Sequence, residues 1–284
     1  MYFSQTNRKR QLLGLVGVVL LVLSLGQIIS ANQGLSRINT RLDELPVTIT
    51  GPEDKLNGSR PLILVAHGLA GSGTVMQGFT YTFAHAGYVV ATWDFDGHAG
   101  NPRPMSPDIY SEGLSLNVQN VLETVVQMGV ADTSRFAILG HSMGSGAALK
   151  FGQRHPNCKA TIAVSPVGTA VTPQLPQNLL LMAGSLEPKF VNSARERLVE
   201  AGGAGGFVDL GTARKFEIIP GVEHISILFD PVTHHLALDW LNESFGVQAG
   251  AKVYTDFRIF WYGLAIIGTL LTATSLIPRF TSIS

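Results

Sequence analysis

The chain has little of several features that would have narrowed its function at once. It holds a single cysteine, Cys158, among 284 residues, so no internal disulfide can form, and a small apolar role suits this residue better than a catalytic one. Its 20 basic and 20 acidic residues cancel, and no basic patch is interleaved with aromatic residues, which argues against a nucleic-acid partner. The two closest histidines, His234 and His235, are adjacent and cannot share one helix face, so the sequence predicts no metal site. The glycine-rich segment at 201–206 follows a helical pattern instead of opening one, so we expect no dinucleotide and no other cofactor.

Two long hydrophobic runs are present, one near each end of the chain. Leu12 to Ala31 contains no charge and only Gln27 as a strongly polar interruption, and Ile259 to Ile277 is equally uncharged. Each run is long enough to cross a bilayer as a helix, and neither has the polar face that a core helix of this length normally shows. We expect two transmembrane helices, which divide the chain into an N-terminal anchor at 1–33, a globular domain at 34–250, and a C-terminal helix and tail at 251–284.

The charges beside the first run predict its orientation. The basic cluster Arg8 to Arg10 precedes it, a pattern that also fits a cleaved signal peptide, but the end of the run lacks a convincing small-x-small cleavage site. An uncleaved signal anchor is therefore favoured. By the positive-inside rule the N-terminus lies in the cytoplasm and the globular domain on the opposite side of the membrane. The charges around the second run predict the opposite orientation in the membrane. Our prediction follows the N-terminal cluster, which is the stronger of the two.

Between the two runs, short apolar segments alternate with longer helical patterns. This alternation is typical of a mostly parallel sheet with helices on both faces. Continuous apolar segments such as Leu62 to Ala66 indicate strands that are buried on both sides. The predicted strands are Val47–Thr50, Leu62–Ala66, Val89–Trp93, Phe136–Leu139, Thr161–Val164, Leu179–Met182 and Lys215–Ile219. The predicted helices are Val75–Ala86, Leu114–Gly129, Met143–Arg154, Phe190–Glu200 and Val232–Phe245.

The pentapeptide Gly140-His141-Ser142-Met143-Gly144 lies between a predicted strand and a predicted helix. In a chain with 31 glycines a G-x-S-x-G pattern alone is a weak signal. The strand–turn–helix context strengthens it, because this is the setting of a nucleophile elbow, in which a strained turn exposes the serine hydroxyl. Glycines on either side tolerate the crowding that such a turn creates.

Polar residues also follow other predicted strands at their carboxyl ends, where reactive groups collect in doubly wound sheets. His67-Gly68 follows the second strand, Glu187 the sixth and His224 the last. With these motifs the chain resembles, from Val47 to Phe245, the α/β-hydrolase superfamily, whose triads run nucleophile, acid, histidine. The elbow sequence is also similar to those of dienelactone-hydrolase-like and cutinase-like esterases. The resemblance implies the α/β-hydrolase fold.

The chemistry of ester cleavage suggests a role for each of these residues. A serine hydroxyl needs an adjacent base, so we assign Ser142 as the nucleophile and His224 as the base. Glu187 would hold the imidazole in the correct tautomer, although many members of the superfamily use aspartate in this place. The weaker candidates for the base are His155, His234 and His235. The weaker candidates for the acid are Glu223 and Asp230.

The tetrahedral oxyanion requires two N–H donors. We expect them to be the backbone groups of Met143, directly after the nucleophile, and of Leu69, directly after His67-Gly68. His67 is expected to order this loop and not to act as a base. The acidic segment that begins at Asp94 is interpreted as a turn ordered by side-chain to backbone bonds, not as a metal cluster.

The sequence thus favours a membrane-anchored serine hydrolase that cleaves carboxylic esters through an acyl-enzyme. An acyltransferase or a peptidase could use the same triad, and a catalytically silent scaffold that binds a partner is a further alternative. Only a short segment, 165–177, separates two predicted strands where a large helical lid would be inserted. An accessible pocket beside a bilayer suggests a small-molecule or lipid-like ester as the substrate.

Overall fold

The structure is a computed structural model, and it describes residues 2–105, 112–247 and 253–277. The chain divides into two compact units, one of residues 34–255 and one that combines residues 1–33 with residues 256–284. The predicted boundary between residues 250 and 251 lies outside the described residues.

The larger unit is built on an eight-stranded sheet with the order β1-β2-β4-β3-β5-β6-β7-β8. The strands β1 and β2 pair antiparallel, as do β2 and β4, and all the other neighbours are parallel. The strand order reverses at β3, so the carboxyl ends of β3 and β5 form a switch point at which ligands commonly bind. The strands are β1 Leu35–Leu42, β2 Leu45–Pro52, β3 Pro61–Ala66, β4 Val89–Trp93, β5 Asp132–His141, β6 Thr161–Val164, β7 Leu179–Gly184 and β8 Arg214–Ile219.

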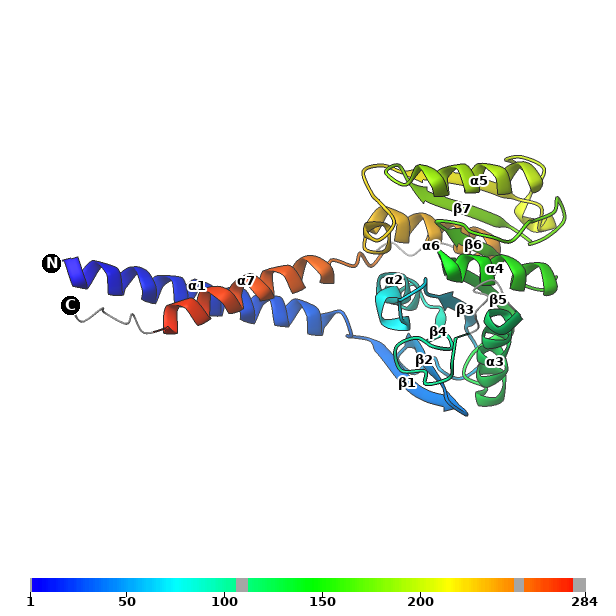
Figure 1. The fold of residues 1–284 in the computed structure, drawn as a ribbon. Helices are drawn as coiled ribbons and strands as arrows, with labels where there is room; N and C mark the ends of the chain where they lie inside the picture. The colour runs from blue at the N-terminus through cyan, green and yellow to red at the C-terminus, as the bar shows by residue number, and fades with distance from the viewer. Residues whose placement is uncertain (1, 106–111, 248–252, 278–284) are drawn as a thin grey trace. The chain divides into compact units, whose positions relative to one another are not determined.

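Helices cover both faces of this sheet (Figure 1). One face packs against α3 Glu112–Met128, α4 Met143–Arg154 and α5 Pro188–Glu200, and the other against α2 Gln77–His85 and α6 Pro231–Phe245. Short 3-10 helices are η1 Gly73–Met76, η2 Val208–Leu210 and η3 Ser226–Leu228. The predicted mostly parallel sheet with helices on both faces is confirmed.

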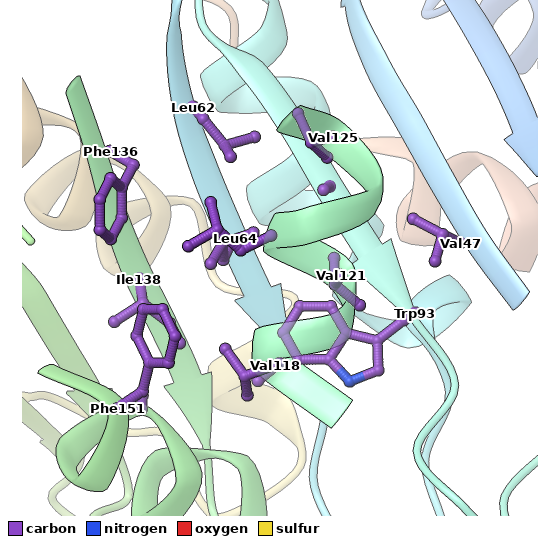
Figure 2. Close-up of a cluster of buried hydrophobic side chains, with 14 of the residues drawn as sticks. Val47, Leu62, Leu64, Trp93, Val118, Val121, Val125, Phe136, Ile138 and Phe151 are labelled. Carbon is purple, nitrogen blue, oxygen red and sulfur yellow. The ribbon is translucent and has the colours of Figure 1, made fainter. Parts of the chain in front are cut away.

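The packing of α3 shows how the core forms. Val118, Val121 and Val125 recur at helical spacing and face Leu62 and Leu64 of β3, as Figure 2 shows, and all five side chains are fully buried. Burying side chains of this size stabilises the fold by about 1.5–3 kcal/mol each. The same cluster includes Phe136 and Ile138 of β5, so α3 packs against both strands that lead to the switch point.

The sequence prediction missed β1. This strand forms a hairpin with β2 across Asp43 and Glu44, and its residues alternate between half-buried and exposed. Polar residues such as Arg37 and Asn39 interrupt its apolar pattern, because an edge strand with one wet face carries charge that discourages pairing with other chains. The strand therefore lacks the continuous apolar signal of the central strands.

The smaller unit is a pair of apolar helices, α1 Tyr2–Ser30 and α7 Arg258–Leu276. The most apolar windows of the two helices are only 11% and 6% buried, whereas a core helix would be mostly buried. The helices approach closely at glycines: a Cβ on Gly268 would lie 2.8 Å from the carbonyl oxygen of Gly17. Arg10 donates to the carbonyl oxygen of Ser275 near the end of α7 (2.9 Å). Both helices are long and apolar enough to be transmembrane anchors.

Candidate active site

Ser142 occupies a strained turn between β5 and α4. Its backbone has φ 51° and ψ −119°, a conformation that L-residues rarely adopt. A Cβ on Gly140 would lie 2.0 Å from the carbonyl oxygen of Gly144, and a Cβ on Gly144 would lie 2.5 Å from that of His67. Both glycines are therefore required by close approach, and the strand–turn–helix geometry is that of a nucleophile elbow.

Three side chains from three strand ends form one hydrogen-bonded chain. Ser142 Oγ lies 3.0 Å from His224 Nε2, and His224 Nδ1 lies 2.9 Å from Glu187 Oε2. Ser142 follows β5, Glu187 follows β7 and His224 follows β8. The structure thus brings together the three residues that the sequence proposed as nucleophile, base and acid, and the longer glutamate reaches the imidazole.

The second oxygen of Glu187 is also bound. Oε1 accepts from the backbone N–H of Gly184 (2.6 Å) and from the hydroxyl of Ser165 (2.7 Å). With His224, the carboxylate has three donors in a site where its side chain is 4% exposed. Sequence reasoning missed Ser165. It directly follows β6, so its place at a strand end was the signal that could have found it.

His224 lies in a more open environment. The His224 side chain is 30% exposed, and the ring of Phe190 stacks on it with centroids 4.2 Å apart and an interplanar angle of 11°. The preceding Glu223 accepts from the backbone N–H groups of Ile225 and Ser226, and these bonds lower the pKa of its carboxyl. Sequence reasoning did not identify Phe190 as part of the site.

The predicted oxyanion donors lie on the two segments that adjoin Ser142. Met143 is the first residue of α4, so its N–H has no partner within the helix. Leu69 follows Gly68, and a Cβ on Gly68 would lie 3.2 Å from the Cβ of Ser142. The side chain of Leu69 is exposed, so a role for this residue would belong to its backbone.

His67 is buried and holds this loop in place. Its Nε2 accepts from the backbone N–H of Phe95 (3.0 Å), and its Nδ1–H donates to the carbonyl oxygen of Gly68 (2.7 Å). Burial lowers its pKa to about 4, so the ring is neutral at physiological pH. Both ring nitrogens are engaged by the backbone, as expected for a residue that orders a loop.

The alternative candidates are occupied elsewhere. His234 Nε2 lies 2.8 Å from the carbonyl oxygen of Leu228, and His155 stacks on Phe151. Asp94 accepts from backbone N–H groups of two neighbouring segments, which makes it part of an ordered turn. Burial raises the pKa of the Cys158 thiol to about 12, which makes it a poor nucleophile. Within residues 2–105, 112–247 and 253–277, no group of His, Cys, Asp and Glu side chains is arranged to hold a metal ion.

Sequence comparison identifies related proteins. The family model for serine aminopeptidases, S33, matches residues 57–202, just over half of the chain; this range includes Ser142 and Glu187 and ends before His224. An uncharacterized protein of Mycobacterium tuberculosis is 25% identical over 184 residues, which cover 59% of this chain and 64% of the relative. An uncharacterized protein of Mycobacterium bovis is 31% identical over 102 residues, covering 36% and 28%. The chain thus spans less than two thirds of the length of these relatives.

Solved structures are similar in fold. An esterase superposes with a TM-score of 0.55 at 16% identity, covering 80% of this chain and 87% of that one. A dienelactone-hydrolase-like protein from Klebsiella pneumoniae gives a TM-score of 0.56 at 15% identity, covering 75% and 98%. At these identities the likeness establishes the α/β-hydrolase fold and not an activity. The fold, the elbow and the matching family model together show that this chain belongs to the serine aminopeptidase S33 family of α/β hydrolases.

Proposed function

We propose that the protein is a membrane-anchored serine hydrolase that cleaves carboxylic esters with a Ser142–His224–Glu187 triad. The observation that carries this proposal is the continuous chain from Ser142 Oγ through His224 to Glu187, with separations of 3.0 and 2.9 Å. A nucleophile, a base in contact with it and a third group that orients the base are the signature of nucleophilic catalysis.

The proposed reaction proceeds in two halves. Ser142 Oγ bonds to the acyl carbon while its proton passes to His224 Nε2, and the resulting oxyanion accepts from the N–H groups of Leu69 and Met143. The C–O bond to the alcohol then breaks, and the alcohol leaves with the proton from His224. Water then attacks the acyl carbon of the acyl-enzyme as His224 Nε2 takes its proton. The ester bond to Ser142 Oγ breaks, the carboxylic acid leaves, and His224 returns the proton to Ser142, while Glu187 accepts from Nδ1–H throughout.

Exposed apolar side chains beside the triad favour an apolar ester. Three apolar side chains are each more than half exposed: Leu69, Leu186 and Ile225. Leu69 belongs to the loop that begins at His67-Gly68, and Leu186 and Ile225 are the sequence neighbours of Glu187 and His224. Such side chains can contact an acyl chain that reaches Ser142. A lipid-like ester fits this surface better than a highly charged one does.

A peptidase is the second candidate. It is favoured by the family model, whose description is that of serine aminopeptidases. The same triad can attack an amide, but the leaving amine must then be protonated by His224 before the C–N bond breaks. An esterase and a peptidase would use the same three residues, so only the choice of substrate distinguishes them.

The test of the chemistry is labelling by a fluorophosphonate probe, with Ser142→Ala as the control. We expect the wild-type protein to be labelled and Ser142→Ala to be unlabelled at equal folded concentration. Equal labelling of both, or of neither, contradicts the proposal. A series of p-nitrophenyl esters of rising chain length, compared with aminoacyl p-nitroanilides, then separates an esterase from a peptidase.

We also propose that α1 and α7 cross the membrane, with the N-terminus in the cytoplasm and the hydrolase unit on the opposite side. The basic cluster Arg8 to Arg10 before the apolar part of α1 supports this sidedness. A cysteine at Val199, which is 76% exposed on α5, can be labelled by a membrane-impermeant maleimide, whereas Cys158 is buried and should stay silent. Val199→Cys should react in intact expressing cells. Reaction only after permeabilisation contradicts the proposed sidedness.

A further inference from the structure

The strand that leads to the nucleophile ends in a buried histidine that contacts the loop of the base. His141 is the last residue of β5 and is 3% exposed. Its Nε2 lies 2.9 Å from the main-chain oxygen of His224, and the two imidazole centroids are 4.7 Å apart. One side chain thus joins the residue beside the nucleophile to the backbone of the proposed base.

The partner of His141 determines which of its nitrogens carries the proton. A carbonyl oxygen only accepts, so Nε2 must carry the hydrogen and donate it to His224. Burial, followed by the proximity of His224, lowers the pKa of His141 to about 3. The ring therefore remains a neutral Nε2–H donor over the pH range in which a serine hydrolase works.

The other side of the ring faces the oxyanion loop. A Cβ on Gly68 would lie 2.9 Å from His141 Nδ1 and 3.4 Å from its Cε1, so only glycine leaves room for the ring in this position. His141 therefore lies between the loop that carries Leu69 and the loop that carries His224. The ring thus contacts both loops at once.

The loop of His224 has few other fixed points. Gly221, Glu223 and Ile225 are exposed, and His224 itself is only half-buried. Besides the bond between His224 Nδ1 and Glu187, two contacts hold this loop to the neighbouring β7 loop: Leu186 N–H donates to the Val222 oxygen, and Gly221 N–H donates to Ser185 Oγ. The bond from His141 is the one that ties His224 itself to the strand of the nucleophile.

From this geometry we propose that His141 is a positioning residue, which holds His224 at its 3.0 Å distance from Ser142 by donating to the main chain of the base. The inference rests on the proposed function of Ser142 and His224. A base displaced by about 1 Å can lose about 100-fold in rate, so the loss of this donor should slow the chemical step and leave probe binding unchanged.

The test compares two matched substitutions in the full-length protein in detergent micelles. His141→Phe keeps a buried aromatic ring and removes the donor. His234→Phe makes the same change at a buried histidine whose Nε2–H also donates to a backbone oxygen, that of Leu228, but on α6. The maximal labelling rate and the half-saturating concentration of a fluorophosphonate are measured for each, with His141→Gln as the variant that can still donate.

We expect His141→Phe to lower the maximal rate by about 10- to 100-fold at an unchanged half-saturating concentration, and His141→Gln to recover most of that loss. His234→Phe should alter thermal stability and leave the rate within about twofold. Equal slowing by both Phe variants, or no recovery with Gln, overturns the positioning role. Failure of the wild type to label at Ser142 overturns the proposed function instead, so the two failures are distinguishable.

A second measurement does not depend on the folding of any variant. Nitrogen-15 spectra of the histidine side chains in the wild-type protein should show His141 as the neutral Nε2–H form from pH 5 to pH 8. A titration of His141 near pH 6.5, or protonation at Nδ1 alone, overturns the proposal.

Discussion

Glu187 and His224, the acid and the base of the proposed triad, are held in different ways. Glu187 is 4% exposed, and its carboxylate accepts from Gly184, Ser165 and His224, so burial and strand-end donors fix it. His224 is 30% exposed; its ring is held by the bond to Glu187 and the stack with Phe190, and its main-chain oxygen by the bond from His141. An acid that only orients can be sealed inside the protein, whereas a base that exchanges protons with substrate and water must stay accessible. The predictions below test this difference.

Glu187→Gln should have the largest effect. The Gln oxygen can still accept from Ser165 and Gly184, which leaves its NH₂ group facing His224 Nδ1. Nδ1 must then accept, the proton moves to Nε2, and the base can no longer take the proton of Ser142. We expect the fluorophosphonate labelling rate to fall by about 1,000- to 10,000-fold with the fold retained. Near-normal labelling would show that Glu187 is not the orienting acid.

Ser165→Ala should have a smaller effect. The substitution removes one of the two donors to Glu187 Oε1 and leaves the donor at Gly184 in place. Because the remaining donor and burial still hold the carboxylate, we expect the labelling rate to fall by about 3- to 10-fold, together with a lower melting temperature. A rate equal to that of Ser165→Thr, which keeps the hydroxyl, would contradict a role for this bond.

Phe190→Leu tests the ring stack on the base. Leucine preserves an apolar side chain but removes the flat surface that lies 4.2 Å from the imidazole of His224. Stacking contributes about 0.5–1.5 kcal/mol, so we expect the labelling rate to fall by about 2- to 10-fold. Phe190→Tyr should behave like the wild type. Equal losses in the two variants would indicate a role other than stacking.

Glu223→Gln should have the smallest effect, and that effect should not vary near neutral pH. Bonds from the N–H groups of Ile225 and Ser226 lower the pKa of this carboxyl. The ionised carboxylate therefore stabilises the loop fully at any pH above the ordinary pKa of a glutamate. The contribution is lost only as the pH falls through the lowered folded value. The ratio of wild-type to variant labelling rates, expected at about twofold, should therefore be constant from pH 6 to pH 9. A ratio that changes within this window contradicts the interpretation.

The central strands and the elbow could be predicted because their signals are local. Strands buried on both faces are continuous apolar runs, and the elbow needs glycines at 140 and 144 for reasons of backbone crowding. The edge strand β1 was missed because its exposed face carries polar residues, which removes the apolar pattern.

The supporting residues could not be predicted because their partners are distant in sequence. Ser165 meets Glu187 across 22 residues, and His141 meets the main chain of His224 across 83. The place of Ser165 directly after a predicted strand is a local signal, but it does not identify Glu187 as the partner. Nothing local distinguishes a histidine such as His141 from a core residue. Only the parallel arrangement of β5 to β8, which aligns their carboxyl ends, brings these side chains together.

The sequence by itself determined the two apolar runs, the alternation of strands and helices, and the order of serine, acid and histidine along the chain. It determined them because hydrophobic periodicity and turn chemistry depend on neighbouring residues. The tertiary structure alone decided that Glu187 reaches His224, that Ser165 donates to Glu187 and that His141 lies within hydrogen-bond distance of the main-chain oxygen of His224. A hydrogen bond tolerates a change of only a few tenths of an ångström in the distance between its two atoms, and for residues from different strands only the packed sheet sets that distance.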